Sequence, residues 1–193
     1  MYYKTKVQDY VRVPPSSFGD EQKLAIIKEL KKKYSGYISP ELGFVIDVSG
    51  VEEVGQGLIL AGDGSTHYQV TFSMITFKPE MQEIVYGKIT NVADFGAFIN
   101  IGPVEGMIHI SQTMNDFVSF SKDGVLLGKN TKRSLKVGDV CRARIIAVSY
   151  KDVSNPKIGL TMRQTGLGKE DWIDEPEEKK EKESKEKEDK KAK

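Results

Sequence analysis

The sequence is poor in the residues that form disulfides and metal sites. It holds one cysteine, Cys141, among 193 residues, and only two histidines, His67 and His109. One cysteine cannot close an internal disulfide, and these three residues lack the spacing of metal-binding clusters. A lone cysteine within an alternating strand pattern is more often a small core residue than a nucleophile. We therefore expect no metal, no cofactor and no thiol chemistry.

Long apolar runs are also missing. Even the segment from Val137 to Val148 is interrupted by charged residues, and nothing approaches the roughly 20 apolar residues of a membrane-spanning helix. The first residues, Met1 to Lys6, lack the apolar centre of a secretion signal. The sequence therefore predicts an intracellular protein without membrane contact.

Charge is abundant but balanced. Lysine and arginine number 29 against 28 acidic residues, which gives a net charge of +1. A nucleic-acid site would therefore depend on local placement of cations. From Pro176 to Lys193 the sequence is almost entirely Glu, Lys and Asp, so we expect a disordered, solubilising tail. Trp172 precedes this tail, and the pattern leaves open whether it docks on a partner or faces solvent.

The first 79 residues predict a small α+β domain. Alternating apolar residues at Val7–Val13, a second apolar segment at Leu42–Val48 and a third, alternating one at His67–Phe77 indicate three strands. Between the first two strands, apolar residues recur at helical spacing. The predicted buried face of that helix comprises Leu24, Ile27, Leu30 and Tyr34.

A glycine-rich segment, Gly50–Gly64, predicts a long loop before the third strand. Gly55 and Gly57 would permit positive φ angles and close approach to a partner. An apolar triplet, Leu58 to Leu60, indicates either an anchor for another protein or an ordinary hairpin packed on its own domain. A phosphate-binding loop is disfavoured, because no Gly-Lys-Ser/Thr follows.

The second region, residues 80–165, predicts short strands separated by glycine turns, which is typical of a small barrel or sandwich. The candidate strands are Val85–Val92, Ala97–Ile101, Met107–Ile110, Val140–Val148 and Lys157–Met162.

Side-chain alternation in these strands separates an aliphatic set from an outward set that holds rings and cations. Exposed rings beside cations suit single-stranded nucleic acid, because bases stack on the rings and cations follow the phosphates. The alternative is that Phe98 is covered by the first domain or by the segment 114–135. The outward set, with Phe95 in a turn, is Tyr86, Lys88, Phe95, Phe98, Met107, His109, Arg142 and Arg144.

Several stretches resemble the S1 RNA-binding domain family. They are Val85–Gly102 with its turn Asp94-Phe95-Gly96, Glu105–Gln112, Val137–Val140 and Ile158–Arg163. The resemblance implies a five-stranded OB-fold barrel. The insertion 114–135 and the turn 150–156 are both longer than the family's pattern. The RNA-contacting positions that the resemblance implies are Phe95, Phe98, His109 and the basic Lys157.

The N-terminal region adds a second resemblance. Met1–Pro15, Leu42–Ile46 and Gly62–Ser65, joined to this barrel, look like the larger stalk subunit of archaeal RNA polymerases, which is similar to the seventh subunit of eukaryotic polymerase II. This resemblance covers Met1 to Asp174. It implies a non-catalytic subunit of DNA-directed RNA polymerase that forms a heterodimeric stalk with a smaller helical subunit.

The same resemblance implies docking on the polymerase core through the loop 53–64, contact with single-stranded nascent RNA, and an archaeal cytoplasmic location at the nucleoid. The expected RNA-binding residues are Lys88, Phe95, Phe98, His109, Arg142, Arg144 and Lys157. The expected core-docking residues are Gly55, Gly57, Leu58, Ile59, Leu60, Gly62, Asp63 and Gly64.

The complete expectation is an α+β N-terminal domain (1–79), an all-β five-stranded OB-fold barrel (80–165), and a linker with a disordered charged tail (166–193). A free-standing RNA-binding factor in translation or RNA decay is the alternative function. An enzyme such as a nuclease is disfavoured, because the sequence holds no convergent carboxylates and no Ser/His/Asp constellation.

Overall fold

The computed structural model describes residues 1–121, 124–152 and 156–173. It divides into two compact units: Met1–Glu80 with Val148–Pro156, and Met81–Ala147 with the chain from Lys157 onward. The charged tail expected from Pro176 lies outside the described residues. Within the described ranges, no helix combines the length and the apolar character needed to cross a membrane.

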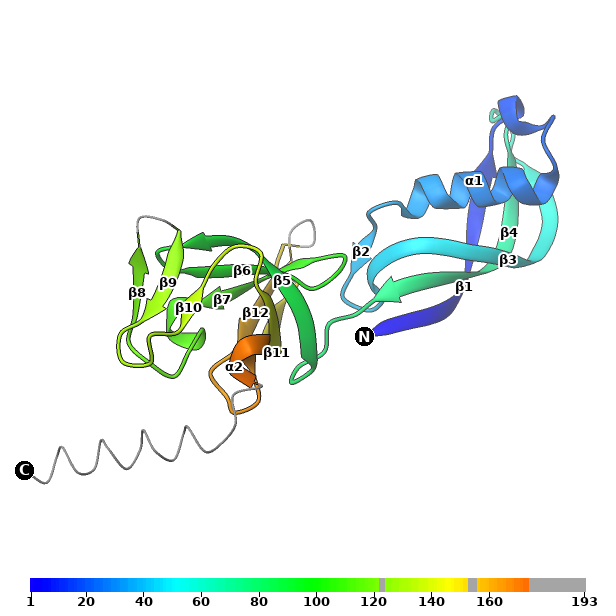
Figure 1. Cartoon of the computed structure of the whole chain (residues 1–193). Coiled ribbons are helices and arrows are strands. Elements are labelled where there is room, and N and C mark those ends of the chain that lie inside the picture. Colours follow the sequence, from blue (N-terminus) through cyan, green and yellow to red (C-terminus); the bar gives the residue numbers. More distant parts are fainter. Residues whose placement is uncertain (122–123, 153–155, 174–193) are drawn as a thin grey trace, which may run out of the picture. The chain divides into compact units, whose positions relative to one another are not determined.

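The first unit is a four-stranded antiparallel sheet in the order β1-β4-β3-β2, with one face packed against a single helix (Figure 1). A short 3-10 turn joins the first strand to the helix. The elements are β1 (Tyr2–Val13), η1 (Pro15–Ser17), α1 (Gln22–Tyr34), β2 (Ile38–Ser39), β3 (Gly43–Ile59) and β4 (Thr66–Phe77).

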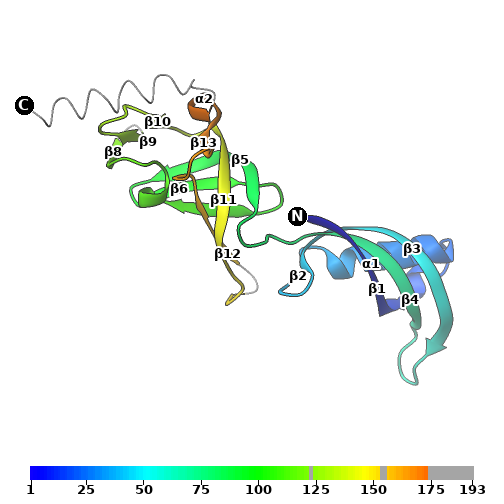
Figure 2. The same cartoon turned by 90° about the horizontal axis from the view of Figure 1, so that it is seen from below.

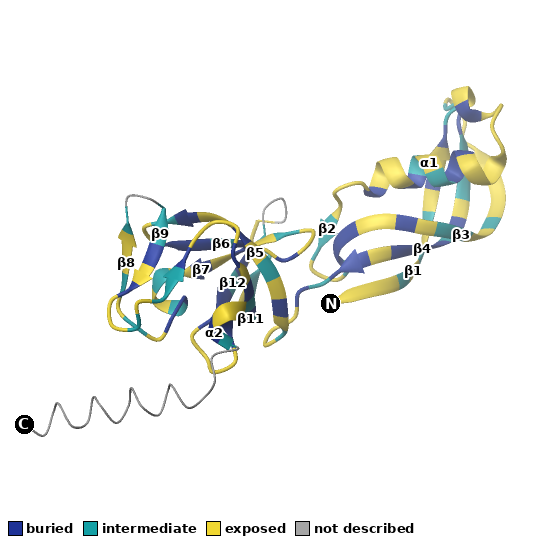
Figure 3. Ribbon diagram, in the orientation of Figure 1, coloured by how far each residue is buried: buried dark blue, intermediate teal, exposed yellow. Residues whose placement is uncertain are grey.

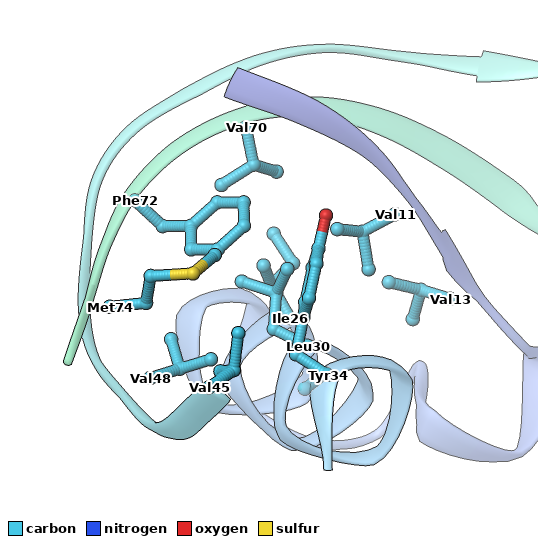
Figure 4. Packing of buried hydrophobic residues seen from close by; sticks show 11 residues of the cluster. Val11, Val13, Ile26, Leu30, Tyr34, Val45, Val48, Val70, Phe72 and Met74 are labelled. Atoms are coloured by element: carbon cyan, nitrogen blue, oxygen red, sulfur yellow. The ribbon is translucent and has the colours of Figure 1, made fainter. Parts of the chain in front are cut away.

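The core of this unit lies between α1 and the sheet. Alternate residues of β1 and β4 point toward the helix because successive strand side chains face opposite ways, and Figure 4 shows them converging on the side chains of α1. The Tyr34 hydroxyl donates a 2.6 Å hydrogen bond to Asp9. Burial and this bond raise the pKa of Tyr34. The buried set in Figure 4 includes Val11, Val13, Ile26, Leu30, Tyr34, Val45, Val48, Val70, Phe72 and Met74.

The helix buries a different face from the predicted one. Ala25 and Ile26 are buried together with Leu30 and Tyr34, whereas Leu24 is 59% exposed. Two overlapping apolar series share Leu30 and Tyr34, so helical spacing alone does not decide between them. The prediction of Leu24 as a core residue was wrong, because packing against the sheet selects the series that begins at Ile26.

The predicted glycine-rich loop is mostly strand. β3 continues for 17 residues to Ile59, so that only residues 60–65 connect it to β4. The register between β3 and β4 shifts at four places, the last between Val54 and Gly57. Such bulges insert an extra residue and bend a strand, and β3 is visibly curved in Figure 1. These glycines therefore indicate an irregular strand rather than a loop.

The second unit is a closed five-stranded barrel. Its strands follow the order β12-β7-β6-β5-β11, and pairing between β12 and β11 closes the sheet (Figure 2). The expected five-stranded barrel is confirmed. Its strands are β5 (Ile84–Ala93), β6 (Gly96–Asn100), β7 (Glu105–His109), β11 (Val140–Ser149) and β12 (Lys157–Thr161), with β13 (Gly168–Lys169) added beside β11.

The barrel interior is filled by the aliphatic set predicted from alternation, and the alternation of buried and exposed residues is visible along β5 in Figure 3. Cys141 is among the buried residues, and burial raises the pKa of its thiol to about 12. Its predicted role as a core residue is confirmed. The buried set includes Val85, Ile89, Ala97, Ile99, Ile108, Cys141, Ala143, Ile145, Ile158 and Leu160.

The insertion before β11 forms a small sheet of its own, in the order β10-β9-β8. A 3-10 turn, η2 (Ile110–Gln112), leads from β7 toward it. The strands are β8 (Val118–Ser121), β9 (Val125–Gly128) and β10 (Ser134–Leu135).

Trp172 lies in a short terminal helix, α2 (Glu170–Ile173), and is buried. The guanidinium of Arg133 lies 5.5 Å from its ring centre. Neither role considered for Trp172 from the sequence is correct, because the side chain packs within the barrel unit instead of facing solvent or waiting for a partner.

We expect Leu30→Ala to lower the free energy of unfolding of the first unit by about 2–5 kcal/mol, because a fully buried leucine leaves a cavity when it is truncated. Leu24→Ala, on the exposed side of the same helix, should change that free energy by no more than about 0.5 kcal/mol. Hydrogen exchange of the β4 backbone amides measures both effects. Equal losses would show that the helix face is wrongly assigned.

Candidate nucleic-acid interface and docking hairpin

A row of side chains crosses the outer face of the barrel. In the strand register, Phe98 on β6 lies between Asn91 on β5 and Met107 on β7, and Met107 pairs with Gly159 on β12. Opposite residues in neighbouring strands have their Cβ atoms about 5 Å apart. The ring of Phe98 is therefore at the centre of a surface that four strands support.

Phe95 extends this surface from the turn between β5 and β6. Its ring is 49% exposed and stands edge-on to Phe98, with the ring centres 6.0 Å apart and the planes at 88°. Phe98 is partly buried, so within its own unit it is neither fully covered nor fully open. The two perpendicular rings present a partly exposed aromatic surface at the start of β6.

His109 completes this aromatic group at the end of β7. Its side chain is exposed and lies opposite Gly96 in the register. Gly96 is required there, since a Cβ atom would lie 2.2 Å from the carbonyl oxygen of Ile108. Nδ1 of His109 lies 2.8 Å from Oγ of Ser111 and accepts a 3.3 Å hydrogen bond from its backbone N–H. The neutral ring then carries its proton on Nε2, which can donate to a ligand.

Two lysines lie beyond Phe98 on the same outer face, on the side away from Phe95 and His109. Lys88 on β5 pairs with Asn100, two residues beyond Phe98 on β6. Lys157 begins β12, two residues before Gly159 and therefore on the same face. Both lysine side chains are exposed. The structure thus brings together five of the seven predicted RNA-binding residues: Lys88, Phe95, Phe98, His109 and Lys157.

The two arginines lie apart from this group. Arg142 pairs with Tyr86, whose position is about 16 Å along β5 from that of Asn91. Its guanidinium lies 4.8 Å from the Tyr86 ring centre, donates to the Tyr86 hydroxyl and contacts the carbonyl oxygen of Gly166 at 3.4 Å. Arg144 is partly buried, and its Nε has no partner among the described residues. Arg142 is therefore held by its own unit, and both arginines lie on β11, away from the rings.

The apolar triplet lies at the tip of the β3–β4 hairpin. Leu58, Ile59 and Leu60 are 55%, 74% and 54% exposed. They do not pack on their own unit, so the interpretation of an ordinary, self-packed hairpin is wrong. Three adjacent exposed aliphatic side chains form an apolar surface of the kind that contacts other proteins.

The glycines of this hairpin have a different role from the predicted one. Neither Gly55 nor Gly57 has a positive φ angle, whereas Gly62 in the turn has φ of 89°. A Cβ atom on Gly57 would lie 2.6 Å from Cγ2 of Thr66 and 2.7 Å from the Tyr68 ring. Gly57 therefore lets the two strands approach each other, and Gly62 alone of these three provides the left-handed turn residue.

Asp63 fixes the turn that carries the triplet. Its carboxylate accepts two 2.9 Å hydrogen bonds from Arg12 on β1 and lies 3.0 Å from Nε2 of His67 on β4. It also accepts a 3.1 Å bond from the backbone N–H of Ser65. The contribution of Arg12 is not visible in the sequence, because nothing local links residues 51 positions apart. The turn is therefore tied to both neighbouring strands.

Within the described ranges, no group of three or more His, Cys, Asp or Glu side chains is placed to hold a metal ion. The chemistry that this arrangement offers is non-covalent: rings for stacking, lysines for phosphates and an apolar tip for a protein surface.

Comparisons with known proteins match both halves of the chain. The SHS2 domain found in the N terminus of Rpb7p, Rpc25p and MJ0397 matches residues 8–64, and the S1 RNA binding domain matches residues 78–154.

Curated relatives match over nearly the full length. DNA-directed RNA polymerase subunit Rpo7 of Saccharolobus shibatae is 38% identical over 175 residues, which is 90% of this chain and 97% of the relative. Rpo7 of Sulfolobus acidocaldarius is 35% identical over 176 residues, 91% of this chain and 96% of the relative. DNA-directed RNA polymerase III subunit RPC8 of Saccharomyces cerevisiae is 33% identical over 114 residues, 59% of this chain and 54% of the relative.

We expect the Asp63 carboxyl to titrate below the ordinary value of about 3.9. Hydrogen bonds from Arg12 and then His67 lower its pKa. Because the pKa falls on folding, the carboxylate stabilises the turn above pH of about 3.9, and this contribution is lost as pH falls through the folded pKa. NMR titration of the Asp63 side chain measures the midpoint. Arg12→Gln should raise it, and an unchanged midpoint in that variant would contradict the assigned cause.

Proposed function

The chain belongs to the Rpo7 family of DNA-directed RNA polymerase subunits, and from this premise we propose that it joins a smaller helical partner in a stalk, docks on the polymerase core and binds the emerging transcript. It is a non-catalytic subunit of the polymerase. The observation that carries the RNA-binding part is the aromatic group of Phe95, Phe98 and His109, which shares one outer face with Lys88 and Lys157. The stalk acts within the polymerase, and so in the archaeal cytoplasm at the nucleoid.

The aromatic group favours single-stranded RNA. Unpaired bases can stack on Phe95 and Phe98, and stacking contributes about 1–3 kcal/mol per base with little dependence on base identity. Lys88 and Lys157 stand at the border of the rings, where they would contact phosphates. Arg142 and Arg144 would act only on a longer strand, because the structure holds them away from the rings.

The hairpin tip favours a protein surface. Leu58, Ile59 and Leu60 carry no charge, and the Asp63 hydrogen bonds hold their turn in place before any partner binds. A pre-ordered apolar anchor loses little conformational entropy on binding. We therefore assign core docking to this tip, with Gly55, Gly57, Gly62 and Gly64 shaping the hairpin rather than making the contact.

A free-standing RNA-binding factor in translation or RNA decay is the second candidate. It would share the barrel and its aromatic group, but an exposed apolar hairpin tip would have no use in it. The relatives that align along nearly the whole chain are named as polymerase subunits, which favours the polymerase function.

We expect Phe98→Ala combined with His109→Ala to weaken binding of a single-stranded oligoribonucleotide by at least about fivefold, since one stacked base contributes about 1 kcal/mol or more. Fluorescence anisotropy with the complete chain measures the dissociation constant. Met81→Ala, an exposed apolar position at the start of the barrel unit, is the control and should leave it unchanged. Unchanged affinity in the double variant would refute the proposed aromatic face.

We expect Leu58→Asp combined with Ile59→Asp to abolish co-purification with the polymerase core, because two carboxylates cannot be desolvated at an apolar contact without a large cost. The tagged chain is recovered from its own cells, and the eluate is assayed for DNA-templated RNA synthesis. Leu24→Asp is the matched control, since it adds a charge at another exposed leucine of the same unit. Retained activity with the tip variant would show that docking occurs elsewhere.

A further inference from the structure

A hollow of about 510 Å³ lies next to the aromatic group, between η2 and the insertion. Its size falls within the roughly 300–1,000 Å³ of typical ligand pockets. None of the expected RNA-binding residues lines this hollow. The side chains that matter for its chemistry are Ser111, Asn115, Asp116, Phe117, Asn130 and Arg163.

Two lining residues of the hollow are hydrogen-bonded to the aromatic group. Ser111, which lines it, is the residue whose Oγ lies 2.8 Å from Nδ1 of His109. The backbone N–H of Ile110, another lining residue, donates a 2.9 Å hydrogen bond to the carbonyl oxygen of Phe95. A strand stacked on Phe95 and His109 would therefore reach the hollow with its next nucleotides.

Phe117 has an exposed side chain on a backbone that hydrogen bonds hold in place. Its side chain is 78% exposed, the highest fraction among the large apolar residues described. Its backbone is held at both ends, because its N–H donates a 2.6 Å bond to Asp116 and its carbonyl accepts a 2.8 Å bond from the N–H of Lys129. A phenyl ring held at its backbone and left open to solvent offers a face for stacking.

Asp116 makes the hollow unsuitable for phosphate. Its carboxylate accepts bonds of 2.7 Å from the backbone N–H groups of Asn130 and Thr131, and further bonds from both of their side chains. Hydrogen bonds from Thr131 and Asn130 lower its pKa, so it stays ionised. A fixed negative charge repels phosphate but tolerates a neutral base.

The side-chain amides of Asn115 and Asn130 offer one hydrogen-bond donor and one acceptor to such a base. Nε of Arg163 donates a 3.2 Å bond to Oδ1 of Asn115, so the Asn115 amide nitrogen remains as a donor. The amide nitrogen of Asn130 is used on Asp116, so its Oδ1 remains as an acceptor. A base edge presents both donors and acceptors, and unstacked RNA bases are read along such edges.

We propose that this hollow takes one unpaired base of the RNA strand that crosses the aromatic group, stacked on Phe117 and hydrogen-bonded by Asn115 and Asn130. The proposal rests on the proposed function and extends it, because it adds a position that distinguishes between bases to a surface that otherwise binds any sequence.

The test is Phe117→Ala in the complete chain, with anisotropy on a single-stranded oligoribonucleotide of about 10 nucleotides, a length within the site sizes of OB folds. We expect at least about fivefold weaker binding, the low end of what one stacked base contributes. Phe120→Ala is the matched control, because Phe120 is an exposed phenylalanine of the same insertion that does not line the hollow. It should bind as the unaltered chain does.

An abasic scan gives a second readout. The base is removed at each position of the oligoribonucleotide in turn. With the unaltered chain, one position should lose affinity by the same factor as Phe117→Ala. With Phe117→Ala, removing that base should cause no further loss, since its partner is already gone. Additive losses would overturn the proposal.

The outcomes separate this inference from the proposed function. If the double variant Phe98→Ala, His109→Ala weakens RNA binding and Phe117→Ala does not, the hollow is not an RNA site. The proposed aromatic face is then still supported. Weakening by Phe117→Ala alone refutes the aromatic face, and it overturns the proposal that the strand reaches the hollow across that face. An unaltered chain that binds no RNA refutes both. Loss of a co-purifying protein on Phe117→Ala, with RNA affinity unchanged, overturns the hollow as an RNA site and identifies it as a protein contact.

Discussion

Closure of the barrel by the pairing of β12 with β11 is the constraint on which the proposed RNA surface depends. A closed sheet has an inside too narrow for anything but side chains, so alternate residues of every strand must fill it. The aliphatic residues of β6 and β7 take those inner positions, and Phe98 and His109 are thereby forced outward. The parallel contact between β7 and β12 then brings Lys157 onto the same surface. The outer aromatic group is a consequence of core packing, not a separate feature of the chain.

The hairpin of the first unit exposes apolar groups by another route. The bulges of β3 let the strand run beyond the region covered by α1, so Leu58 and Ile59 have nothing of their own unit to pack against. Exposed aliphatic side chains gain nothing from the hydrophobic effect until they are covered. The bonds from Arg12 and His67 to Asp63 hold the turn without the help of apolar packing. The hairpin tip therefore exposes apolar side chains on a turn that hydrogen bonds hold in place.

The sequence predicts those features that depend on a period of two. The barrel strands and the inward positions of Ala97, Ile99 and Cys141 follow from alternation, and the structure confirms them. The prediction of the buried face of α1 was wrong at Leu24, because two apolar series share Leu30 and Tyr34. The prediction of a long loop at Gly50–Gly64 was wrong because glycine occurs at strand bulges as well as in loops.

Contacts between distant residues could not be read from the sequence at all. Arg12 with Asp63, and Asp116 with Asn130, are pairs of ordinary polar residues whose meeting depends on the completed sheets. The hollow beside His109 was missed for the same reason. Its lining residues come from η2, the insertion and the segment after β12, and no local spacing relates them.

The distribution of cations indicates how such a surface would hold a transcript. The chain has almost no net charge. Arg142 is engaged by Tyr86 and Arg144 lies farther along β11, which leaves Lys88 and Lys157 on the face that carries the rings. Phosphate contacts account for most of the salt dependence and the non-specific strength of nucleic-acid binding. A surface with few such contacts must obtain its affinity from stacked bases, which a duplex does not offer because its bases are already paired and stacked on one another. The small number of cations beside the rings would therefore make the proposed surface selective for single strands.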